Sequence, residues 1–124
     1  MWRTTMDRLE LFVRTIDDKF GKDIVAIDMK LASPMFDTFI ICTADNARLL
    51  NAIKDNVQDE LDKHEIFVKK IEGARDSQWI LMDYGDIVIH IFSPEERHNY
   101  QLEKLWGDQH RIDISAFLEK PNEL

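Results

Sequence analysis

Apolar residues three and four positions apart open the chain and predict a helix over about residues 5–20, with Thr4 and Asp7 as its cap and Gly21 after its end. Its apolar positions are Met6, Leu9, Phe12, Val13, Ile16 and Phe20. A second helix is predicted from a cap at Asp45 or Asn46 to about Lys63. Its apolar stripe consists of Leu49, Leu50, Ile53, Val57 and Leu61.

A third helix is predicted from Pro94 to Leu105 or Trp106, because Ser93-Pro94-Glu95-Glu96 reads as a capping box with proline at the first helical position. Gly107 follows as its stop.

Between the helices lie β-branched runs that predict strands. The runs at 23–29 and 37–43 are apolar on both alternating faces, which is typical of strands inside a covered sheet. A third strand, 66–72, follows the second helix directly, and this order favours a right-handed crossover between parallel neighbours. Strands 78–83 and 86–92 flank Tyr84-Gly85, a spacing that predicts an antiparallel hairpin.

The element order αββαββα therefore predicts one α/β domain, residues 1–107, with a mixed sheet of about five strands and helices packed on it. Residues 108–124 are expected to form a tail or a short docking helix.

Charge and composition narrow the function. The chain has 124 residues, 44% of them apolar, and a formal net charge of −8. This charge is the wrong sign for coating nucleic acid, so we expect a basic protein partner and no sequence-specific contact with nucleic acid. The single cysteine, Cys42, allows no internal disulfide, and no run of 18 or more apolar residues suggests a membrane span. These features predict a cytoplasmic protein.

Candidate catalytic groups each have a structural alternative. Asp83 and Asp86 flank the tight turn and could bind a divalent cation, but turn carboxylates more often accept backbone hydrogen bonds. His90 and His98 have no third ligand at a familiar spacing, so His90 is expected to be an interior, hydrogen-bonded histidine. Cys42 lies within an apolar strand and is expected in the core. No phosphate-binding glycine motif is present, which disfavours an ordinary nucleotide site. Because none of these candidate groups is convincing, we predict no catalytic residue, metal or cofactor.

Aromatic residues offer a better candidate site. Trp79, Tyr84 and Trp106 could anchor a protein interface, although periodicity alone slightly favours core packing for each. In the strand 78–83, alternation places Trp79, Leu81 and Asp83 on one face and Ile80, Met82 and Tyr84 on the other. Both faces are apolar, so one can be covered by helices and the other by a partner.

The stretch WILMDYGDIVIHIF at 79–92 resembles the ribosomal silencing factor family (RsfS, also called Iojap). Further matching residues follow at Glu95, Arg97, Tyr100, Leu102, Glu103, Lys104, Leu105, Trp106 and Gly107. The resemblance covers about residues 5–107. It implies a non-enzymatic cytoplasmic repressor of translation that binds the large ribosomal subunit through ribosomal protein number fourteen. Such binding would block joining of the small subunit when nutrients are scarce. By the same resemblance Trp79 and Tyr84 contact that protein, with Leu81, Met82 and Asp83 around them, and the chain can pair as a homodimer.

One segment departs from the family, because Ala44-Asp45-Asn46-Ala47-Arg48-Leu49 stands where Gly-Thr-Ser-Ser before Arg-His is usual. Two other functions remain open at this point. The first is a metal-dependent nucleotidyltransferase using Asp83 and Asp86, and the second is an assembly factor for the large subunit without anti-association activity.

Overall fold

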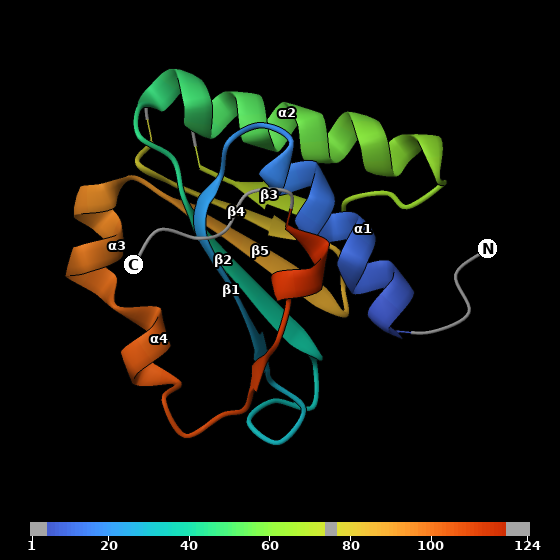
Figure 1. The fold of residues 1–124 in the computed structure, drawn as a ribbon, viewed down its shortest axis with the longest axis vertical. Helices are drawn as coiled ribbons and strands as arrows, with labels where there is room; N and C mark the ends of the chain where they lie inside the picture. The colour runs from blue at the N-terminus through green and yellow to red at the C-terminus, as the bar shows by residue number, and fades with distance from the viewer. Residues whose placement is uncertain (1–4, 74–76, 119–124) are drawn as a thin grey trace.

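The computed structural model describes residues 5–73 and 77–118, and these build one mixed sheet with helices on both faces (Figure 1). The strand order is β3-β4-β5-β2-β1-β6. In chain order the elements are α1 (Thr5–Asp17), β1 (Lys22–Asp28), β2 (Thr38–Thr43), α2 (Ala47–Lys63), β3 (Lys70–Glu72), β4 (Trp79–Asp83), β5 (Ile87–Phe92), α3 (Pro94–Tyr100), α4 (Leu102–Leu105), β6 (Arg111–Ile112) and a 3-10 turn at Ser115–Phe117. The predicted α/β class with a mixed sheet is confirmed.

Helix boundaries follow the local signals in the sequence. Asn46 Oδ1 accepts the backbone N–H of Leu49 at 2.8 Å, and Ser93 Oγ accepts that of Glu96 at 3.1 Å. Both are the expected N-caps. After α1 ends at Asp17, Phe20 adopts the left-handed region (φ 64°), and the backbone N–H of Gly21 donates to Ile16 O. The predicted cap at Thr4 lies outside the described residues.

The sheet connections correct one prediction. The β4–β5 hairpin is antiparallel as expected, and its turn uses Gly85 at φ 94°. However, the strand that follows α2 is not a neighbour of β2. It pairs antiparallel with β4 at the far edge, and the parallel partner of β2 is β5.

The strand predicted over 66–72 is also shorter than expected. The chain leaves α2 through Glu65 in the left-handed region and buries Ile66, so regular pairing with β4 begins only at Lys70.

The third predicted helix is broken in two. Gln101 adopts φ 45°, which ends α3 and redirects the chain into α4. The turn brings Leu102 and Trp106 against the apolar cluster formed on the sheet by Ile41 and Phe92 with their neighbours. An uninterrupted helix was the wrong prediction, because packing against the sheet outweighed local helical propensity here.

Residues after Gly107 add a sixth strand to the expected five. Backbone pairing joins Ile112 to Ala26 and Arg111 to Ile27, so β6 lengthens the sheet beyond β1. Ile114 is 6% exposed and joins the main core, and Phe117 packs against that core from the 3-10 turn.

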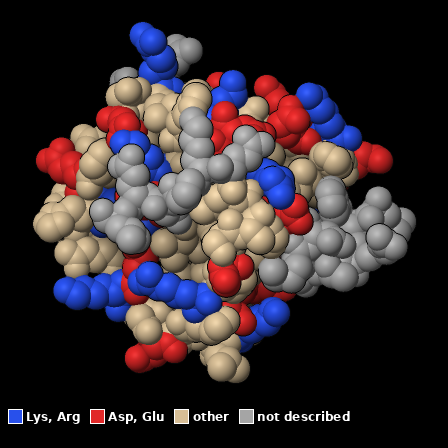
Figure 2. Space-filling view, viewed as in Figure 1, with Lys and Arg blue, Asp and Glu red and all other residues tan. Residues whose placement is uncertain are grey.

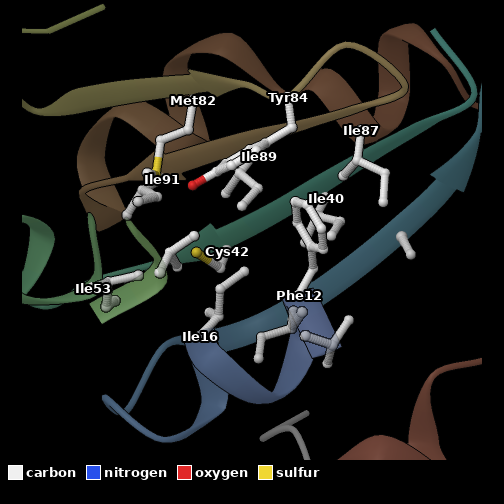
Figure 3. Packing of buried hydrophobic residues seen from close by; sticks show 14 of the residues in the cluster. Phe12, Ile16, Ile40, Cys42, Ile53, Met82, Tyr84, Ile87, Ile89 and Ile91 are labelled. Atoms are coloured by element: carbon white, nitrogen blue, oxygen red, sulfur yellow. The ribbon is translucent and has the colours of Figure 1, made fainter. Parts of the chain in front are cut away.

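The main core fills the space between the sheet and the pair α1 and α2 (Figures 1 and 3). A smaller apolar cluster lies on the opposite face, partly covered by α4 and by the loop between β1 and β2. None of the described helices is both long and apolar enough to span a bilayer.

Candidate protein-interaction surface

The strand β4, second from one edge of the sheet, presents different side chains to the two faces of the sheet. Ile80 and Met82 point into the main core and are 1% and 0% exposed. Trp79, Leu81 and Asp83 point the other way, and each remains partly exposed. We call the side of β4 and β5 that faces away from α1 and α2 the outer face. The alternation predicted from the sequence is confirmed.

Tyr84, in the turn after β4, belongs to the core. It is 3% exposed, and its ring meets Phe12 of α1 edge-on at 4.9 Å between centroids. Figure 3 shows Tyr84 and Met82 pointing into the layer of apolar side chains that also holds Phe12 and Ile16. Burial, together with the charge of Asp62, raises the pKa of the Tyr84 hydroxyl, which has no hydrogen-bond partner among the described residues.

These positions divide the five residues of the predicted site between the two faces of the sheet. Three of its five residues, Trp79, Leu81 and Asp83, share the outer face. The side chains of Met82 and Tyr84 are buried beneath α1 and α2 and are not accessible to a partner in this structure. Met82 and Tyr84 pack β4 against the core, which holds the strand in place under the outer face.

Aromatic rings form a continuous cluster on the outer face. Trp79 packs on Phe92 and on Tyr100, with centroid distances of 4.8 and 4.7 Å. Phe39 of β2 meets His90 at 4.8 Å and Trp106 at 6.4 Å. Tyr100 is 51% exposed, and Trp79, Phe39 and Trp106 are half-buried. This arrangement leaves apolar ring edges available for burial against another protein.

A hydrogen bond fixes the orientation of the indole within this cluster. Trp79 Nε1–H donates to His90 Nδ1 at 3.2 Å. Burial lowers the pKa of His90 to about 4, so the imidazole is neutral at pH 7 and its Nδ1 is free to accept. The expectation of an interior, hydrogen-bonded histidine is confirmed, and its partner turns out to be the predicted contact residue.

Charged side chains border the outer face at the edge of the sheet. In the ladder, Lys70 of β3 lies opposite Asp83, and Glu72 lies opposite Leu81. Lys70 Nζ lies 3.6 Å from Glu72 Oε1 on the same strand. The rim is therefore polar while the centre is aromatic and aliphatic. This distribution is typical of protein–protein interfaces.

The two turn carboxylates are engaged within the hairpin region. Asp83 Oδ1 accepts Gly85 N–H at 2.7 Å, which is the structural role weighed against metal binding. Asp86 forms two bonds with Arg8 of α1, at 2.8 and 3.2 Å, and accepts its neighbour's N–H. No group of three or more potential metal ligands occurs among the described residues.

Cys42 is fully buried, and burial raises its pKa to about 12. The thiol therefore stays protonated at pH 7, and its expected position in the core is confirmed.

Sequence reasoning missed three members of the aromatic cluster, Phe39, Phe92 and Tyr100. Phe39 carried a signal, because alternation along β2 places it on one face with Ile41. The parallel pairing of Phe39 with Val88 then brings it beside the outer face of β5. Tyr100 matched the family motif but carried no signal of its contact with Trp79, since its position depends on the break at Gln101.

Comparison with known proteins gives consistent matches over most of the chain. A family model described as "Ribosomal silencing factor during starvation" matches residues 3–123. A Bacillus subtilis protein named ribosomal silencing factor RsfS is 41% identical over 106 residues, which is 86% of this chain and 90% of the relative.

More distant relatives extend the similarity. A crystal structure from Chromobacterium violaceum superimposes with a TM-score of 0.81 at 28% identity, covering 97% of this chain and 92% of the other. A mouse protein named "Mitochondrial assembly of ribosomal large subunit protein 1" is 31% identical over 103 residues, 79% of this chain and 44% of the mouse protein.

Proposed function

The chain belongs to the ribosomal silencing factor family, and on this premise we propose that it binds the large ribosomal subunit and prevents the small subunit from joining. The contact is made by the outer face of β4, with Trp79 and Leu81 at its centre and Asp83 at its rim. Its target is ribosomal protein number fourteen. The protein acts in the cytoplasm, where it lowers translation when nutrients are scarce.

One observation carries this proposal: an aromatic cluster remains half-open on a strand whose opposite side is fully packed. Leu81 lies beside the ordered indole of Trp79, and the hydrogen bond to His90 orders that indole before any partner arrives. Preordered aromatic anchors lose little conformational entropy on binding, which favours affinity.

The net charge of the chain and the steric mechanism both support binding through this surface. The net charge of −8 favours encounter with a basic ribosomal protein and disfavours indiscriminate adhesion to RNA. Steric exclusion requires that a folded body occupy the joining face and requires no reacting group. The domain supplies that body, and β4 supplies its attachment.

Co-sedimentation with separated ribosomal subunits under joining conditions tests the proposal. The wild-type chain is expected to travel with the large subunit and to reduce the peak of joined ribosomes. Leu81→Lys introduces a charge at the centre of the outer face but leaves the inner face of β4 untouched. We expect it to weaken large-subunit binding about tenfold or more, as at a central interface residue.

Leu31→Lys is the matched control. Leu31 is 96% exposed in the loop between β1 and β2, so the same chemical change there should leave binding within twofold. If both variants retain normal binding while folded, the outer face is not the contact surface. If the wild-type protein stays at the top of the gradient and joining is unaffected, anti-association itself is refuted.

The mouse relative's name supports a second candidate function, assistance in assembling the large subunit. Under this alternative the chain would bind immature large-subunit particles and leave the joining of mature subunits unchanged. The same gradients, run with precursor particles, separate the two functions.

A further inference from the structure

A polar hollow lies among α3, α4 and β6. It has a volume of about 530 Å³ and is lined by residues of α3, α4 and β6 together with the residues that join them. Its charged lining residues are Arg97, His98, Glu103, Lys104 and Arg111. The hollow exists because Gln101 breaks the helix and β6 then returns the chain to the sheet.

An ion pair between Arg97 and Glu103 forms part of the wall of the hollow. Arg97 donates two hydrogen bonds to Glu103, at 2.7 and 3.2 Å, and a third to Thr43 Oγ1 at 2.9 Å. Burial acts to raise the pKa of Glu103, but Arg97, with a smaller contribution from Arg111, outweighs it and lowers that pKa. The one carboxylate of the lining is thus already held by Arg97.

Lys104 and Arg111 make no ion pair within residues 5–73 and 77–118. Both are exposed, and both line the hollow from different elements. Figure 2 shows blue side chains running across the surface at the level where Figure 1 places α4 and β6. A positive site is therefore concentrated here on a chain whose net charge is −8.

We propose that this hollow binds phosphate groups of an RNA backbone through Lys104 and Arg111, with Arg97 and Glu103 holding the wall in shape. The inference rests on the proposed function, because a ribosomal subunit is the polyanion that such a chain would meet. Guanidinium and ammonium groups recognise phosphate without reading bases, so the contact adds affinity and orientation and carries no sequence information.

RNA fits the hollow better than an acidic peptide for two reasons. A phosphate carries its charge on a compact group that a guanidinium can bind with two parallel hydrogen bonds. The hollow is also open at the surface and Gly107 lines it without a side chain, so a bulky backbone can approach. The acidic remainder of the surface would confine RNA to this site.

The test uses the full chain and a fluorescein-labelled 20-nucleotide RNA hairpin, with anisotropy measured between 50 and 200 mM KCl. The variant Lys104→Gln/Arg111→Gln removes the two lining cations that form no ion pair among the described residues and leaves Arg97 intact. The control Lys19→Gln/Lys63→Gln makes the same change in net charge at exposed positions near the ends of α1 and α2.

We expect wild-type binding that weakens with salt. The hollow variant should bind at least fivefold more weakly at 50 mM KCl, and its slope of log affinity against log salt should be smaller by about 1.5, as for two lost phosphate contacts. The control should stay within twofold of the wild type.

Three results would overturn the inference. Equal weakening in both variants would mean that only net charge matters. Displacement of the hairpin by millimolar inorganic phosphate would indicate a small-anion site, and polyglutamate binding without RNA binding would indicate an acidic protein partner. Because this assay contains no ribosome and leaves Leu81 unchanged, its failure is separate from failure of the gradient experiment on the proposed function.

Discussion

Replacing Tyr84 by phenylalanine separates a role in the core from a role in partner contact. The Tyr84 side chain is 3% exposed, and its hydroxyl has no hydrogen-bond partner among the described residues. Burying an unpaired hydroxyl costs about 1–3 kcal/mol. We therefore expect Tyr84→Phe to leave the free energy of unfolding unchanged or to raise it by up to about 2 kcal/mol.

Tyr84→Ala should behave very differently. A buried aromatic side chain contributes about 200 Å² of surface, which at about 25 cal/mol per Å² corresponds to about 5 kcal/mol. The edge contact with Phe12 at 4.9 Å would also be lost, leaving a cavity between β4 and α1. Measured costs of such truncations are about 3–5 kcal/mol, a large part of the stability of a small domain.

Urea unfolding followed by circular dichroism measures both variants, and co-sedimentation with large subunits measures binding of the folded Tyr84→Phe protein. We expect Tyr84→Phe to bind as the wild type does. Normal stability with binding reduced fivefold or more would show that the hydroxyl contacts the partner, which refutes the assignment of Tyr84 to the core. A loss of stability above about 1 kcal/mol would show that the hydroxyl is hydrogen-bonded in solution.

Three further predictions concern the stability of the fold and the reactivity of its buried groups. His90 has a pKa of about 4 when folded, against about 6.5 in the unfolded chain, so only the unfolded state gains a proton between these values and stability falls as the pH drops through this window. His90 should therefore lower the free energy of unfolding by about 2 kcal/mol between pH 7 and pH 5. Urea titrations at the two pH values should show that this contribution is absent in His90→Gln. Arg97→Ala should lower stability by about 2 kcal/mol, since it leaves Glu103 partly buried without its cation; a double-mutant cycle with Glu103→Gln should give a coupling energy well above zero. Cys42 should not react with a disulfide reagent at pH 8 in the folded protein and should react stoichiometrically in urea, because its thiol is buried and has a pKa of about 12.

Helix caps and tight turns were predicted correctly, because the residues that form them lie within a few positions of one another in the sequence. The caps at Asn46 and Ser93 and the turn at Gly85 are all where the sequence indicated. Each depends on hydrogen bonds or backbone angles spanning two to four residues. Such signals are nearly independent of the rest of the fold.

Predictions failed where distant packing decided the outcome. No local signal marks Gln101 as a break, because the break is stabilised by contacts of Leu102 and Trp106 with the sheet. The two residues of β6 are too few to show a strand period, and their pairing with Ala26 and Ile27 spans most of the chain. Sheet order, which separates β3 from β2, is likewise a non-local property.

The candidate site shows a further limit of reasoning from resemblance. A run of residues from 79 to 84 can be recognised as one motif, yet a strand sends alternate side chains to opposite environments. Trp79 and Leu81 face outward, whereas Met82 and Tyr84 stabilise the same strand from within. Disruptive substitutions on the two sides, such as Leu81→Lys and Tyr84→Ala, should both weaken binding to a partner, but for different reasons. Outward changes should remove the contact from a folded protein, and inward changes should remove the fold that presents it, so binding data on this strand can be interpreted only alongside unfolding curves for the same variants.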